Sequence, residues 1–87
     1  MYLHIGNGEC IKIEDIIGIF DLDTSTVSKI TKKYISKKEK EKLVMYTDFD
    51  LPRSFIVIKD KDGEKVRLSR ISSTGLKQRI ETDNYAE

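Results

Sequence analysis

Cysteine and histidine are nearly absent from this chain of 87 residues, in which Cys10 and His4 are the single examples. One cysteine cannot close a disulfide within the chain, which excludes the small secreted domains that are stapled by disulfides. Structural zinc sites need about four Cys, His or acidic ligands, so two such residues predict no metal centre. We expect no other cofactor.

Long apolar runs are also missing. The longest, residues 16–20 and 55–58, fall far short of the roughly 20 residues that a membrane-spanning helix needs. Residues 1–6 lack the basic start of a secretory signal peptide. We therefore expect a cytoplasmic protein that makes no contact with a membrane.

Residues that commonly carry out catalysis are scarce. Histidine is the usual proton carrier near neutral pH, and His4 falls within a predicted strand, where we interpret it as a half-exposed strand residue. Cys10 lies beside a predicted turn and is interpreted as a small packing residue, because no second histidine is present to activate it. The chain is therefore predicted not to be an enzyme.

Two acidic pairs and one glycine-rich turn fit structural roles better than binding sites. Asp21 with Asp23, and Asp48 with Asp50, could bind magnesium, but helix capping and loop solvation account for them as well. Gly6-Asn7-Gly8 could hold a phosphate on its amides, but neither a helix nor a P-loop lysine follows it. We interpret all three as structural.

The first half of the chain predicts a hairpin and a buried strand. Gly6-Asn7-Gly8 lies between two β-prone runs, and Asn-Gly suits a tight turn whose central residues need positive φ. Residues 16–20 are apolar at nearly every position, which is typical of a strand that is covered on both faces.

A helix follows that strand. The Asp, Ser and Thr side chains of residues 21–26 are suited to cap it. Behind them, Val27, Ile30 and Tyr34 fall at helical spacing while lysines occupy the other faces. This pattern predicts an amphipathic helix over residues 25–38.

The second half predicts a strand, a second hairpin and a last short helix. The expected elements are a strand at 43–46, a loop at 48–52, hairpin strands at 54–59 and 64–71 around a turn at 60–63, and a helix capped within 72–74. On the second hairpin strand, Val66 and Leu68 alternate with Lys65, Arg67 and Ser69, which indicates one solvated face. Residues 82–87 are polar and are expected to fray.

These elements predict an α+β fold: a small, mainly antiparallel sheet of about five strands, from two hairpins, with one amphipathic helix and a short C-terminal helix. We expect residues 1–87 to form a single domain. A chain of this length buries only about 60–65% of its unfolded surface. Self-association is therefore the expected source of further stability.

Positive charge gathers in one segment. Between positions 29 and 42, only Glu39 and Glu41 oppose a run of lysines, namely Lys29, Lys32, Lys33, Lys37, Lys38, Lys40 and Lys42. Such a run can neutralise nucleic-acid phosphates, although lysine does so as a point charge and reads no sequence. An ordinary solvated helix face is the equally open alternative.

Three motifs resemble a known family. They are Met1-Tyr2-Leu3-His4-Ile5-Gly6, Glu14-Asp15-Ile16-Ile17-Gly18-Ile19-Phe20-Asp21, and Ser72-Ser73-Thr74-Gly75-Leu76-Lys77-Gln78-Arg79. Together they are similar to the RemA/RemB family of bacterial extracellular matrix regulators. The resemblance implies a small α+β subunit that closes into a homo-oligomeric ring and binds double-stranded DNA to regulate biofilm-matrix genes.

The chain departs from that family at two places. Asp15 stands where the RemA branch has an arginine, and the loop at 48–53, where that branch has an arginine cluster, keeps only Arg53 as a basic match. Acidic replacements repel phosphate, so DNA binding is expected to rely on Arg53 and the helix lysines Lys32, Lys33, Lys37 and Lys38. The alternative hypothesis is a protein-interaction or assembly module that does not bind DNA, with a RemA-like protein as its partner.

Overall fold

The computed structural model describes residues 1–22, 29–47 and 51–86, with side chains described up to residue 81. The elements are β1 (Tyr2–Gly6), β2 (Glu9–Lys12), the 3-10 turn η1 (Ile13–Asp15), β3 (Ile16–Asp21), α1 (Lys29–Lys40), β4 (Val44–Tyr46), β5 (Ser54–Asp60), β6 (Gly63–Ser69) and α2 (Ser73–Ala86). The α+β class predicted from the sequence is confirmed.

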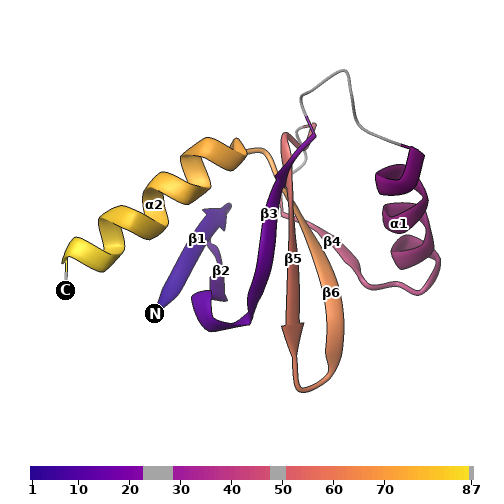
Figure 1. Cartoon of the computed structure of the whole chain (residues 1–87), viewed down its shortest axis with the longest axis horizontal. Helices are drawn as coiled ribbons and strands as arrows, with labels where there is room; N and C mark the ends of the chain where they lie inside the picture. The colour runs from indigo at the N-terminus through magenta and orange to yellow at the C-terminus, as the bar shows by residue number, and fades with distance from the viewer. Residues whose placement is uncertain (23–28, 48–50, 87) are drawn as a thin grey trace.

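The strands of the described residues number six, one more than predicted, and they form two sheets (Figure 1). β1 and β2 make a two-stranded antiparallel sheet, and the other four strands have the order β3-β5-β6-β4. β4 pairs with β6 in parallel. That pairing was not predicted, because the hairpin turns in the sequence specify only antiparallel neighbours.

Both predicted hairpins are confirmed. Asn7 and Gly8 have φ of 50° and 78°, which is the positive φ that the first turn requires. In the second hairpin, Asp60 pairs with Gly63, whose φ is 118°, and the Asp62 amide donates a hydrogen bond to Asp60 Oδ1 at 2.8 Å. Local turn chemistry therefore fixes the register of both strand pairs.

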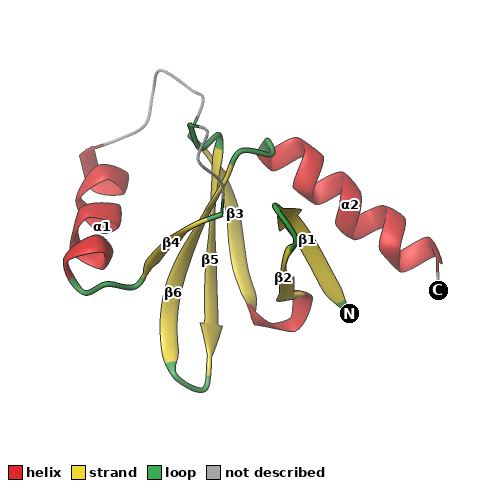
Figure 2. Ribbon diagram, turned by 180° about the vertical axis from the view of Figure 1, so that it is seen from behind, coloured by secondary structure: helices red, strands yellow, loops and turns green. Residues whose placement is uncertain are grey.

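One face of the four-stranded sheet is covered by the β1–β2 hairpin and α2, which lie side by side beyond β3 (Figure 2). The core on this face contains Leu3, Ile5, Ile11, Ile19, Ile56, Ile58 and Leu76.

Ser72 caps α2, because the Gly75 amide donates to Ser72 Oγ at 3.1 Å. α2 extends to Ala86 and is longer than the short helix predicted. Fraying of residues 82–87 stays a prediction.

The opposite face carries a smaller core of Phe55, Val57, Val66 and Leu68, against which α1 packs. α1 contacts this core through Tyr34 and Ile35, whereas Ile30 is 80% exposed. Ile30 nevertheless lines one hollow with Tyr34 and Phe55, so it lies on the predicted apolar face of the helix, although that face leaves it mostly uncovered. The predicted caps at positions 23–26, Val27 and the helix start at 25 lie outside the described residues.

Two further sequence expectations need correction. Ser69, assigned to a solvated face, is 1% exposed, and its hydroxyl donates to the Ile5 carbonyl oxygen at 2.7 Å. On β3, Ile17 and Phe20 remain 57% and 46% exposed, although the apolar run predicted a strand covered on both faces. β3 lies at the edge of the sheet, with β5 as its one neighbour among the described strands.

Candidate nucleic-acid interface

A stripe of lysines follows the outer face of α1. Lys32, Lys33, Lys37 and Lys40 are exposed and, together with Ser36, line a shallow hollow of about 330 Å³. Residues three and four positions apart share one helix face, so Lys33, Lys37 and Lys40 form one row, and Lys32 lies in the adjoining row with Ser36. We call these four residues the lysine stripe. It can meet several phosphates of one nucleic-acid backbone at once.

Lys38 belongs to the opposite side of α1. Its ammonium lies 3.7 Å from Glu64 Oε2 on β6 and 5.8 Å from the centre of the Tyr34 ring. The Tyr34 hydroxyl donates a hydrogen bond to the same carboxylate oxygen of Glu64. The structure thus separates Lys38 from the other three predicted lysines, because it takes part in anchoring the helix to the sheet.

The Tyr34–Glu64 contact perturbs both groups. Burial and then the Glu64 carboxylate raise the pKa of Tyr34 from 10.0 to about 12. The hydrogen bond from Tyr34, and then the charge of Lys38, lower the pKa of Glu64. Both shifts favour the pair of neutral phenol and ionised carboxylate at neutral pH.

Replacing Tyr34 with Phe should lower the free energy of unfolding by about 1 kcal/mol, because the hydrogen bond to Glu64 is lost while the ring remains. Urea denaturation at neutral pH measures this change. The matched control is Tyr46→Phe. The Tyr46 hydroxyl lies 3.3 Å from Glu39 on the exposed surface. The control should change stability by less than about 0.5 kcal/mol, and equal losses in both variants would contradict an anchoring role for Tyr34.

The pH dependence of the Tyr34→Phe difference follows from the two pKa shifts. The pKa of Glu64 is lowered in the folded state. Its contribution to the stability of the fold is therefore present above its ordinary pKa and is lost as the pH falls through its folded-state pKa. The pKa of Tyr34 is raised in the folded state. Its contribution to the stability of the fold is therefore present below pH 10.0 and is lost as the pH rises towards about 12. The stability advantage of the wild type over Tyr34→Phe should therefore shrink at both extremes.

Arg53 lies on a different element from the lysine stripe. It is exposed and immediately precedes β5, while α1 stands at one side of the sheet (Figure 1). The Arg53 amide donates to the Ser69 carbonyl oxygen at 2.8 Å, and its own carbonyl oxygen accepts from the Leu22 amide at 2.8 Å. These bonds fix the backbone of Arg53 at the end of β3 and β6.

Of the acidic residues at the two departures from the family pattern, the structure describes Asp15 but not those of the loop at 48–53. Asp15 is half-buried in η1, directly before β3. Asp48 and Asp50 lie outside the described residues. The Asp15 carboxylate lies directly before β3, so this position offers phosphate no positive charge.

His4 and Cys10 face each other across the β1–β2 hairpin. Cys10 is exposed, so its interpretation as a packing residue is wrong. Its sulfur lies 3.1 Å from His4 Nδ1, a contact that the hairpin register produces by pairing the two residues. The sequence signal for it was the Asn-Gly turn, which fixes that register. Within the described ranges, no three His, Cys, Asp or Glu side chains cluster as metal ligands.

Comparison with known proteins identifies the family. The family model called RemA-like, with the description "Extracellular matrix regulatory protein A-like", matches residues 2–80. The chain belongs to the RemA-like family. It is also 32% identical over 81 residues to Extracellular matrix regulatory protein B of Bacillus subtilis (strain 168), an alignment that covers 93% of this chain and 91% of that protein.

Membership of the RemA-like family confirms the resemblance seen in the sequence and indicates a regulatory role. The family is one of regulators, and its description names no enzymatic activity. In the described part of the chain, neither helix is long and apolar enough to span a membrane.

Proposed function

We propose that this RemA-like protein is a cytoplasmic DNA-binding regulator of biofilm-matrix genes that acts as a homo-oligomeric ring. Phosphate contacts would come from Lys32, Lys33 and Lys37, with Arg53 as a further contact from the sheet. Lysine and arginine at the phosphates give affinity and orientation, while sequence preference would come from DNA shape.

The observation that carries this proposal is the lysine stripe. Its side chains project from the face of α1 that is turned away from the sheet. Among the described residues, those that line the hollow are four lysines and Ser36, without a carboxylate. A field of one sign on an exposed helix attracts a polyanion.

Self-association is supported by apolar groups left in the open on β3. Ile17 and Phe20 are 57% and 46% exposed on an edge strand, and unprotected apolar edges are normally covered. A ring would also repeat the lysine stripe in every subunit. Repetition converts weak individual contacts into strong binding when one DNA molecule engages several copies.

The first test is the salt dependence of binding to duplex DNA, with the mass in solution determined alongside. We expect a mass several times that of one chain, and an affinity that falls about a thousandfold or more between roughly 50 and 200 mM salt when six or more phosphates are contacted. An oligomer that binds no DNA at low salt would instead support the protein-interaction module. A monomer that binds DNA would refute the ring alone.

A further inference from the structure

A groove on the hairpin-covered side of the sheet is unrelated to the lysine stripe. It has a volume of about 460 Å³ and lies between the β1–β2 hairpin and the turn end of the β5–β6 hairpin. Its walls include Tyr2 and Lys12 from the first hairpin and Lys61 from the second, and its floor includes Ile58 and Arg67. This volume is in the range of small-molecule sites.

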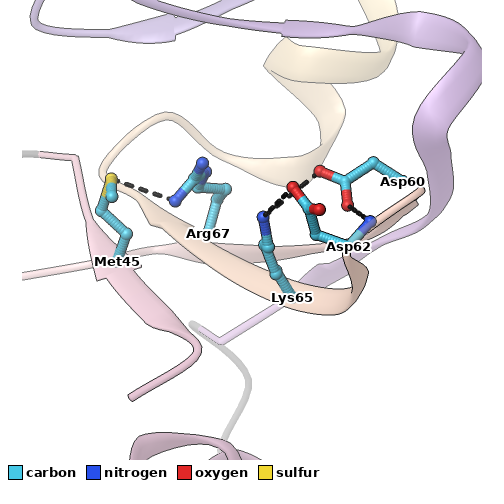
Figure 3. Close-up of polar contacts among 5 residues, drawn as sticks. All are labelled: Met45, Asp60, Asp62, Lys65 and Arg67. Atoms are coloured by element: carbon cyan, nitrogen blue, oxygen red, sulfur yellow. Dashed lines mark hydrogen bonds and ion pairs between the residues drawn. The ribbon is translucent and has the colours of Figure 1, made fainter.

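Arg67 is the distinctive residue of the groove. It pairs with Ile56 on β5 and with Met45 on β4, so it projects from the sheet face on which the β1–β2 hairpin packs. Within the described residues, the hydrogen-bond partner of its guanidinium is the sulfur of Met45, 3.0 Å from Nη1 (Figure 3). A thioether is a weak acceptor, whereas guanidinium has five N–H donors. A half-buried arginine therefore retains donors for an anion.

The acidic residues nearby are mostly engaged. Lys65 lies 3.3 Å from Asp60 Oδ2 and 3.9 Å from Asp62 Oδ2, and Figure 3 shows its ammonium directed towards both carboxylates, with Arg67 apart from them. The hydrogen bond from the Asp62 amide is the main reason that the pKa of Asp60 is lowered. The lining itself holds three carboxylates, Asp15, Asp60 and Asp62, and three cationic groups, Lys12, Lys61 and Arg67. With Lys65 paired to Asp60 and Asp62, the local charge sums to one positive unit, which favours an anionic ligand over a cationic one.

We propose that this groove binds a small phosphorylated molecule, with the Arg67 guanidinium holding the phosphate through two hydrogen bonds. Lys12 and Lys61 add charge at the rim, and the exposed ring of Tyr2 packs against the rest of the ligand. Guanidinium matches phosphate in a bidentate geometry that lysine does not reproduce. The site is separate from α1, so the inference does not depend on DNA binding by the lysine stripe.

The test is a titration of the labelled full chain with pyrophosphate and with guanosine monophosphate, followed by NMR. Saturable shifts are expected at Arg67, Lys12 and Tyr2. Arg67→Gln should weaken binding roughly tenfold to a hundredfold, since charged hydrogen bonds are lost. Should Arg67→Gln disturb folding, Lys12→Gln serves as the second variant, because Lys12 is exposed and its replacement is expected to weaken binding several-fold.

The control is Lys32→Gln/Lys33→Gln/Lys37→Gln, which should bind both probes as the wild type does. Three results with these probes would overturn the proposal: neither probe gives a saturable shift, both the Arg67 and the Lys12 variants bind like the wild type, or the shifts are confined to α1. A short DNA duplex is the last arm. If it produces the same Arg67 shifts, the groove is part of a DNA path and the small-molecule assignment is wrong.

Discussion

DNA affinity is expected to fall about five-hundred-fold in roughly 0.1 M salt, for each lysine stripe that engages the duplex, when Lys32, Lys33 and Lys37 are all replaced by glutamine. Each lysine that neutralises a phosphate releases counterions, and at that salt concentration this release raises the affinity about eightfold. The losses from the three lysines of one stripe multiply. The slope of log affinity against log salt should become shallower by about 0.9 for each phosphate that is no longer neutralised. Fluorescence anisotropy with duplex DNA over a salt series measures both quantities.

The matched control removes the same charge elsewhere. Lys12, Lys59 and Lys77 are exposed and lie on β2, β5 and α2. Their triple replacement with glutamine should weaken binding far less and leave the slope nearly unchanged. If both triple variants lose affinity equally, the effect is one of net charge, and the lysine stripe is not the contact surface.

Lys38 gives a second comparison within the same helix. Its ion pair with Glu64 turns it towards the sheet, so Lys38→Gln should reduce DNA affinity less than Lys37→Gln. The sequence contained the signal for this difference. Lys38 follows Tyr34 by four positions and therefore shares the face of Tyr34, which packs on the sheet.

The sequence predicted those parts of the fold whose causes are local. The Asn7-Gly8 turn, the Asp60–Gly63 turn and the Ser72 cap each involve residues within a few positions of one another. The parallel pairing of β4 with β6 joins residues far apart in the chain, and no local pattern specifies it. Ile30 lies on the Tyr34 face as its spacing predicts, yet it is 80% exposed, because helical spacing gives the face of a residue and not its depth of burial.

Polar residues were predicted less well than apolar ones. The chemistry of Ser69 predicts solvent exposure, yet the Ile5 carbonyl oxygen and the Ile71 amide satisfy its hydroxyl in the interior. The alternation around Arg67 predicts a solvated strand face. Only the position of the β1–β2 hairpin, which the sequence does not give, turns that face into a groove. The burial of Ser69 and the groove around Arg67 both arise from contacts between elements and not from the elements themselves.

Ile17→Lys is expected to dissociate the proposed oligomer. Ile17 lies at an irregularity in the β3–β5 pairing and is 57% exposed, so a lysine there should leave the single chain stable. In an interface that covers this edge, however, the new ammonium would be buried without a partner, at a cost of about 4 kcal/mol, or roughly a thousandfold in the association constant. Light scattering coupled to size-exclusion chromatography should show single chains where the wild type is a larger assembly.

Two controls separate the loss of an interface from a general effect of charge or size. Ile17→Val keeps the edge apolar and should retain the mass of the wild type, while Gln78→Lys adds the same charge at an exposed site on α2 and should do likewise. An Ile17→Lys protein with the wild-type mass would show that β3 is not the interface.

If the variant does dissociate, its DNA affinity should fall as well, although each subunit keeps its lysine stripe. Such a loss would follow because DNA would then engage one stripe at a time instead of several.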